Sequence, residues 1–324
     1  MSAAAVKVGI NEVAPRDGLQ NESVFVPTDD KVVWIDQLSA LGYARIEVTS
    51  FTSPKAIPML RDAEEVMRRI RRAPGVVYTA LVPNARGAER AIDGRTDEFN
   101  LVMSASETHN LANLRMTREQ SFRTLAETVR IAQAARVPVN VSLSCAFGCP
   151  MEGEVPAATV LDWVARFDAL GVDGVTLCDT TGMADPAQVL ALCRAAIERF
   201  PRLAFTGHFH DTRGLGGANV WAALQAGVTR FDASLGGIGG CPYAPGASGN
   251  VATEDVVHLL ACVGADCGIE VEALAPASAR LAGLLGHALP SAVGRAGPRW
   301  FRHPPPADID AIRARALARD TDPS

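Results

Sequence analysis

The feature that most constrains the fold is a repeated alternation of short, β-branched apolar runs with longer helical patterns. Such runs recur at intervals of roughly 22–40 residues, which favours parallel strands joined by right-handed crossovers. An eightfold β/α alternation within about 260 residues predicts an α/β TIM (β/α)8 barrel, with an open doubly wound sheet as the lesser alternative. The strand candidates begin near Val6, Arg45, Val76, Glu98, Pro138, Gly174, Leu203 and Thr229.

The alternation stops after about Cys267, and no linker divides the chain before that point. Residues 1–267 are therefore expected to form the barrel domain. Residues 268–305 are expected to add one or two C-terminal helices packed against it. The proline-rich segment that follows predicts a weakly ordered tail over 306–324.

The segment "TDDKVVWIDQLSALG" predicts a helix whose two ends can be recognised in the sequence. Thr28 or Asp29 is expected at the N-cap and Gly42 at the C-terminal end, where each residue type is favoured. Five aliphatic side chains are spaced to form one broad apolar face. They are Val32, Val33, Ile35, Leu38 and Leu41.

Composition excludes several classes of protein. The 324-residue chain is 48% hydrophobic and 21% charged, and no apolar run approaches the ~20 residues needed to cross a bilayer. The net charge of −5, without a basic stripe, argues against nucleic-acid binding. Seven cysteines without framework spacing indicate reduced thiols. The start leaves no room for a targeting peptide, so we expect a cytoplasmic protein.

The stretch "FTGHFHDTRG" reads as a buried strand that nevertheless carries two histidines. Side chains alternate along a strand, so His208 and His210 point the same way while Phe209 points the other way. Two imidazoles at this spacing can converge on one divalent metal. An isolated H-x-H is more often an ordinary strand end, so the motif needs partners.

Those partners are found where the other predicted strands end. In a TIM barrel the active site lies at the C-terminal ends of the strands, so polar residues there can face one cavity. A capping or loop-stabilising role remains the alternative for any single one of them. They are Arg16, Asp17, Gln20, Glu47, Asp179, His208, His210, Asp211, Cys241 and Asn250.

The predicted metal ligands are Asp17, His208, His210 and Asn250. This mixed oxygen and nitrogen set, without a thiolate, favours Mg²⁺ or Mn²⁺, although zinc is not excluded. The loop "GGIGGCPYAPGASGN" contains six glycines and one cysteine. Cys241 in such a loop can deliver a proton in a water-poor site, or it can be an inert loop residue.

Six stretches together resemble the 3-hydroxy-3-methylglutaryl-CoA (HMG-CoA) lyase family over roughly residues 6–265. They are "PRDGLQNE", "IEVTSFTSPKAIPM", "SCAFGCPMEGEV", "CDTTG", "HFHDT" and "GGIGGCPYAPGASGNVATEDVV". The resemblance implies metal-dependent retro-Claisen cleavage of HMG-CoA to acetoacetate and acetyl-CoA in leucine degradation. It also implies an acyl-CoA substrate and a homo-oligomer, a dimer or larger.

The resemblance implies a role for each candidate residue. Arg16 would stabilise the enolate oxygen, Cys241 would protonate the enolate carbon, and His208 or Asp17 would serve as the general base. Glu47 would assist Arg16 in catalysis, with Asp179 in support behind the ligands. Gln20 and Arg213, together with Arg16, would contact the substrate.

Two positions depart from better-known members of that family. Arg213 stands where a tyrosine is common, and Met151 stands where an aromatic residue is often seen. Both are expected near the substrate entrance, so a related substrate such as citramalyl-CoA is the alternative. A catalytically silent metal-binding barrel is a second alternative, of the binding class.

Overall fold

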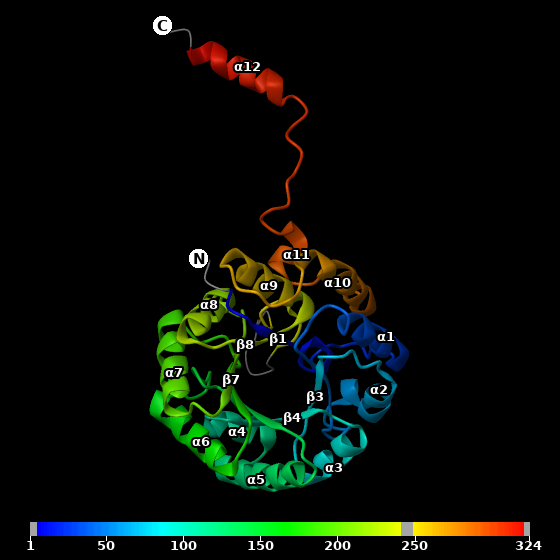
Figure 1. Ribbon diagram of the computed structural model, residues 1–324, viewed down its shortest axis with the longest axis vertical. Coiled ribbons are helices and arrows are strands. Elements are labelled where there is room, and N and C mark those ends of the chain that lie inside the picture. Colours follow the sequence, from blue (N-terminus) through cyan, green and yellow to red (C-terminus); the bar gives the residue numbers. More distant parts are fainter. Residues whose placement is uncertain (1–4, 241–248, 321–324) are drawn as a thin grey trace.

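Eight parallel strands close into a barrel in the computed structural model, which describes residues 5–240 and 249–320 (Figure 1). Strands that are consecutive in the sequence are neighbours in the barrel, and the first strand closes it against the last. The predicted TIM barrel is thus confirmed. The strands are β1 (Gly9–Glu12), β2 (Arg45–Ser50), β3 (Val77–Leu81), β4 (Glu98–Ser104), β5 (Val139–Ser144), β6 (Gly174–Asp179), β7 (Ala204–Phe209) and β8 (Arg230–Ala233).

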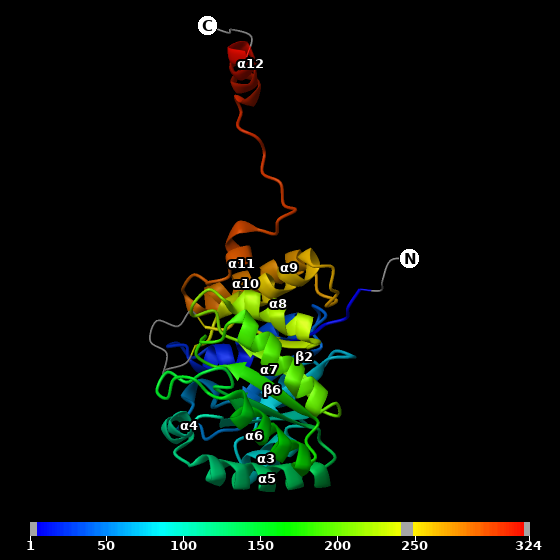
Figure 2. The same cartoon turned by 90° about the vertical axis from the view of Figure 1, so that its left-hand side faces the viewer.

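Helices surround the strands as an outer ring (Figures 1 and 2). They are α1 (Thr28–Leu38), α2 (Ala63–Arg69), α3 (Ala85–Asp93), α4 (Glu107–Leu114), α5 (Arg118–Ala134), α6 (Ala157–Leu170), α7 (Pro186–Arg199), α8 (Gly216–Ala226) and α9 (Thr253–Cys262). Three short turns lie in the connections: η1 (Ala14–Gly18), η2 (Pro58–Leu60) and η3 (Leu235–Gly237). No helix in the described ranges is both long enough and apolar enough to span a bilayer.

The strands are buried on both faces, which explains their nearly continuous apolar runs. Phe209 points outward from β7 and packs on Phe147, with the ring centroids 5.8 Å apart. The residues on either side of it, His208 and His210, lie within the site cluster described below. The alternation predicted for this strand is therefore observed, and it directs both imidazoles into the barrel.

The beginning of α1 differs from the prediction. Pro27 occupies the N-cap, and the Thr28 hydroxyl donates a hydrogen bond to Asp62 Oδ2 (2.8 Å) instead of capping its own helix. Val33, expected on the apolar face, is 49% exposed, whereas Trp34 is fully buried. The prediction failed here because a tertiary contact to Asp62 outweighs the local capping preference.

The C-terminal helices of the prediction are present as α10 (Val271–Leu285) and α11 (Ala292–Ala296). α10 contacts α1 and α9 on the outside of the barrel. A further helix, α12 (Ile309–Asp320), was not predicted. An exposed segment over residues 301–308 connects it to the body, and α12 lies away from the barrel in both views (Figures 1 and 2).

Candidate active site

The site is built from the ends of β1 and β7, which are separated in the barrel only by β8. β1 leads directly into the η1 turn, which carries Arg16 and Asp17. β7 carries His208 near its end, His210 follows the strand directly, and the backbone of His210 forms a β-bridge with Asn250. The fold therefore brings together residues that are more than 190 positions apart in the sequence.

Asp17, His208 and His210 form a cluster in which the ligand atoms all lie within 4.8 Å of one another. The Nε2 atoms of the two imidazoles are 3.1 Å apart. Asn250 lies beside the cluster, where its Nδ2 donates to Asp17 Oδ2 (2.8 Å) and to the carbonyl of Ile238 (3.2 Å). Its predicted role as a ligand would require the amide oxygen to face the cluster instead.

The chemistry of these donors fits a divalent cation. Burial and the neighbouring His208 lower the pKa of His210 to about 3, so its imidazole is neutral. Burial alone would raise the pKa of Asp17, but Arg16 and the two histidines lower it to about 2. His210 Nδ1 is buried without a hydrogen-bond partner among the described residues. One carboxylate and two imidazoles with available lone pairs are suitable ligands for Mg²⁺, Mn²⁺ or zinc.

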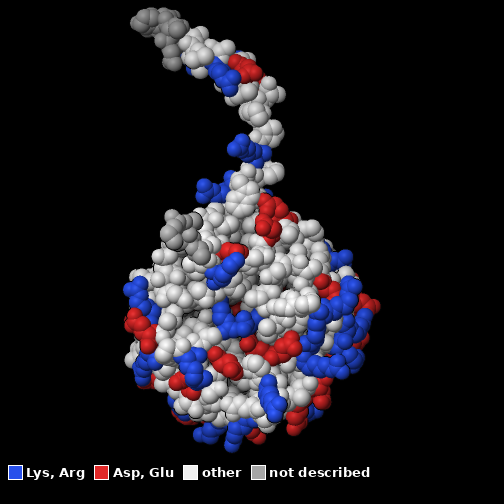
Figure 3. All heavy atoms as spheres, viewed as in Figure 1, with Lys and Arg blue, Asp and Glu red and all other residues white. Residues whose placement is uncertain are grey.

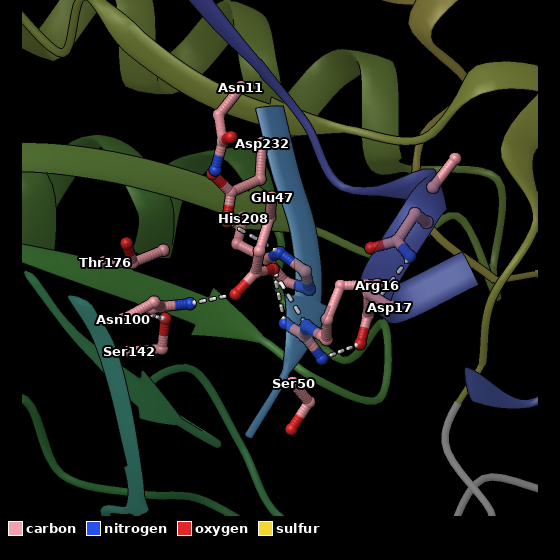
Figure 4. A network of polar contacts seen from close by, with 12 residues as sticks. Asn11, Arg16, Asp17, Glu47, Ser50, Asn100, Ser142, Thr176, His208 and Asp232 are labelled. Atoms are coloured by element: carbon pink, nitrogen blue, oxygen red, sulfur yellow. Dashed lines mark hydrogen bonds and ion pairs between the residues drawn. The ribbon is translucent and has the colours of Figure 1, made fainter. Parts of the chain in front are cut away.

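Arg16 is held by two carboxylates next to this cluster (Figure 4). Its Nε donates to Glu47 Oε2 (2.8 Å), and one terminal nitrogen donates to Asp17 Oδ1 (2.6 Å). The other oxygen of Glu47 accepts from Asn100 Nδ2 (2.8 Å). Burial opposes the charge of Arg16, but Glu47 and Asp17 raise its pKa above the usual value. A permanently charged guanidinium is thereby fixed at the site.

A cavity of about 340 Å³ opens onto these groups. Arg16, Asp17 and both histidines line one part of it, and Gln20 contributes a buried Oε1 that has no hydrogen-bond partner among the described residues. Uncharged polar side chains such as Ser142 and Thr180 line a further part. The lining also includes six apolar residues: Ala56, Ile57, Leu81, Pro83, Val102 and Leu114. The cavity therefore offers charged, polar and apolar side chains to a bound molecule.

Arg213 and Asp179 are among the predicted residues that do not line this cavity. Arg213 is exposed, and its guanidinium donates to the carbonyls of Thr181 (3.0 Å) and Gly182 (2.8 Å). Asp179 Oδ1 accepts from the backbone N–H groups that follow β6 at Met183 (2.7 Å) and Ala184 (3.1 Å). Burial raises the pKa of Asp179 to about 6. Substrate binding by Arg213 and support of the ligands by Asp179 stay predictions.

Cys241 lies outside the described residues. The residue before it, Gly240, lines the cavity, and its carbonyl accepts from Asn21 Nδ2 (2.9 Å).

Met151, the other departure from the family pattern, is 43% exposed. On the face shown in Figure 3, acidic and basic side chains are interspersed around the rim and near the centre, and uncharged residues cover much of the rest.

Two polar residues that support the site from inside the barrel were not predicted. Asp232 accepts from His208 Nδ1 (3.1 Å), and Asn100 bonds to Glu47. The signal was present, because each lies in the middle of a predicted strand with apolar neighbours, "RFDAS" and "EFNLVMS". A polar residue at such a position is buried and requires a partner.

Comparison with known proteins agrees with this geometry. The model of the family described as HMGL-like matches residues 7–280. Hydroxymethylglutaryl-CoA lyase YngG of Bacillus subtilis is 47% identical over 285 residues, covering 88% of this chain and 95% of that protein. (R)-citramalyl-CoA lyase of Chloroflexus aurantiacus is 42% identical over 304 residues, covering 90% of this chain and 95% of that protein.

A solved structure extends the likeness to three dimensions. The HMG-CoA lyase from Acinetobacter baumannii, in complex with coenzyme A and 3-methylmalate, superposes with a TM-score of 0.90 at 47% identity. The match covers 94% of this chain and 100% of that chain. On the family match and these relatives, the chain belongs to the HMGL-like family.

Proposed function

We propose that this protein is a carbon–carbon lyase that cleaves HMG-CoA to acetoacetate and acetyl-CoA. The observation that carries the proposal is the Asp17, His208 and His210 cluster beside a fixed Arg16 in one cavity. The named activity of the Bacillus subtilis relative supports the choice of substrate. An acyl-CoA substrate is further supported by the coenzyme A bound to the Acinetobacter baumannii relative.

Asp17, His208, His210 and Asn250 would hold the metal, which we propose is Mg²⁺ or Mn²⁺, with zinc as the alternative. When bound, such a cation polarises coordinated oxygen atoms and lowers the pKa of a hydroxyl group. The protein's own residues would perform the remaining tasks. A cytoplasmic location, a role in leucine degradation and a homo-oligomeric state stay predictions from the sequence.

The cleavage begins when a base takes the proton of the substrate's tertiary hydroxyl. His208 has only Nε2 available, because Nδ1 is hydrogen-bonded to Asp232. Asp17 uses one oxygen for Arg16 and the other for Asn250, but each carboxylate oxygen has a second lone pair. Asp17 and His208 therefore both stay candidates for the base, His208 only where its Nε2 lone pair is not occupied by the metal.

Collapse of the resulting alkoxide breaks the carbon–carbon bond and leaves the enolate of acetyl-CoA. Arg16 would stabilise the enolate oxygen through charge-assisted hydrogen bonds. Glu47 holds the guanidinium in place from behind, so Arg16 needs little reorganisation during the reaction. Cys241 would then donate a proton to the enolate carbon.

The substrate is tested by comparing purified enzyme on HMG-CoA and citramalyl-CoA with Mg²⁺ under identical conditions. We expect the larger kcat/KM with HMG-CoA. Citramalyl-CoA is the second candidate because the Chloroflexus aurantiacus relative, at 42% identity, is named for it. A larger kcat/KM with citramalyl-CoA would make citramalyl-CoA the substrate. If the enzyme cleaves no 3-hydroxyacyl-CoA, the protein is a catalytically silent metal-binding barrel.

Metal removal is expected to abolish activity. Treatment with excess EDTA should reduce cleavage to background, and Mg²⁺ or Mn²⁺ should restore it, because the bound cation would lower the pKa of the substrate hydroxyl that the base deprotonates. His210→Ala should weaken metal affinity, measured by isothermal titration calorimetry. His303→Ala, at an exposed position in the segment before α12, is the control and should bind metal normally. Full activity in excess EDTA would contradict the proposal.

A further inference from the structure

Asp232 lies between two strands that both contribute to the site. In β8 it is the register partner of Asn11 in β1 and of His208 in β7. Its side chain is buried within the barrel, only 6% exposed. Figure 4 shows the three side chains close together, above and to the left of Arg16 and Asp17. The barrel register thus fixes which residues the carboxylate can reach.

Both oxygens of this carboxylate are used. Oδ2 accepts from His208 Nδ1 (3.1 Å), and Oδ1 accepts from Asn11 Nδ2 (2.9 Å). An ionised carboxylate only accepts hydrogen bonds. His208 therefore carries its proton on Nδ1, and Asn11 keeps the carboxylate from rotating away.

The position of this proton determines what His208 can do. With Nδ1 protonated, the neutral imidazole has its lone pair on Nε2, which lies 3.1 Å from His210 Nε2 and within the cluster with Asp17. A ring nitrogen that carries a hydrogen can neither bind a metal nor accept a proton. The lone pair is thus needed at Nε2 whether His208 is a metal ligand or the general base.

We propose that Asp232 is a positioning residue that fixes the tautomer and ring orientation of His208, with Asn11 as its support. Carboxylate partners of metal-binding histidines act in this way, and their loss typically lowers metal affinity about 10–100-fold. The inference rests on the proposed function in that it assigns a divalent cation to the cluster. It goes beyond that function by giving Asp232 a role, although Asp232 would neither contact the cation nor take part in the reaction.

Asp232→Asn tests this role with almost no change in shape. The new amide has one accepting and one donating end, so either Asn11 or His208 must face an NH₂ group. If that group faces His208, it donates to Nδ1 and forces the proton onto Nε2. If Asn11 turns its amide and accepts from that group, His208 keeps a hydrogen bond only to a neutral oxygen, which is a weaker acceptor than the carboxylate. We expect a 10–100-fold loss of Mn²⁺ affinity, measured by titration calorimetry without substrate.

The double substitution Asn11→Asp with Asp232→Asn exchanges the two groups. The new carboxylate at position 11 accepts from the new amide at position 232, whose oxygen then accepts from His208 Nδ1. The required tautomer is restored without changing the net charge, so we expect most of the lost Mn²⁺ affinity to return. A purely structural role for Asp232 predicts no such rescue.

Asp62→Asn is the matched control for loss of a buried carboxylate. Asp62 bonds to Lys31 (2.7 Å) away from the cluster, so this variant should lose thermal stability and keep Mn²⁺ affinity. Wild-type Mn²⁺ affinity in folded Asp232→Asn would overturn the proposal. So would failure of the double variant to recover while remaining folded.

The tautomer can also be observed directly in the wild-type protein, which does not depend on any variant folding. ¹⁵N NMR of histidine-labelled protein, without metal and at pH 8, should show His208 protonated at Nδ1 and unprotonated at Nε2. Protonation at Nε2 would overturn the role of Asp232. If the wild type binds no Mn²⁺ but shows the expected tautomer, the metal centre of the proposed function fails and the tautomer control by Asp232 stands.

Discussion

Arg16→Met is expected to lower kcat about 10²–10⁴-fold, with a much smaller change in KM. Methionine fills similar space but provides neither charge nor hydrogen-bond donors. The loss falls mainly on kcat because the guanidinium acts on negative charge that develops as the carbon–carbon bond breaks. Steady-state kinetics with HMG-CoA and saturating Mg²⁺ measure both parameters.

The barrel contains a matched control for this variant. Arg45 begins β2, the strand that carries Glu47, and forms its own carboxylate pair with Glu98 (3.2 Å). It does not line the active-site cavity. Arg45→Met should therefore lower the unfolding temperature but leave kcat within a few-fold of the wild type. If Arg16→Met changes only KM, Arg16 anchors the substrate and does not stabilise the transition state.

The barrel could be predicted because each strand has a recognisable pattern in its own short stretch of sequence. Strands such as "RIEVTS" and "GVTLCD" are short β-branched or apolar runs, and all eight begin within three residues of where the sequence places them. Parallel pairing then follows from the length of the connections, which are long enough for a helix. The cluster of Asp17, His208 and His210 could be predicted because barrel topology gathers strand ends at one face.

The details that failed depend on contacts that the sequence does not encode locally. Thr28 was expected to cap α1, but its hydroxyl bonds to Asp62, 34 positions away. Val33 was expected on the apolar face of the same helix, whereas it is 49% exposed and Trp34 is buried. Each outcome depends on how neighbouring elements pack, and no residue pattern within one element specifies that packing.

Asp232 illustrates a different failure. A single aspartate inside a predicted strand belongs to no recognisable motif. The residues that it contacts are determined by the register between β7, β8 and β1. Only the closed barrel shows that it faces His208. Polar residues on the inner face of a predicted barrel therefore merit the same scrutiny as those at strand ends, because burial obliges them to bond to something.

Cys241→Ser is expected to reduce turnover about 10²–10⁴-fold while fold and metal content stay intact. A serine hydroxyl is similar in size to the thiol but is a far weaker acid, so it would protonate the enolate carbon slowly. The chain immediately before this residue lines the cavity at Gly240, and Asn250, a short distance after it, bonds to Asp17. Turnover is measured by activity assays of the purified variant, and its metal content by metal analysis.

Thiol reagents provide an independent test of the same residue. Burial raises the pKa of Cys178, which also lines the cavity, well above its usual value, so its thiol should react slowly. Cys262 is exposed and does not line the cavity, which makes Cys262→Ser the matched control. Inactivation should persist in Cys262→Ser, and a bound substrate analogue should slow it. Near-normal turnover in Cys241→Ser would move proton donation to another group, since an inert cysteine tolerates the exchange.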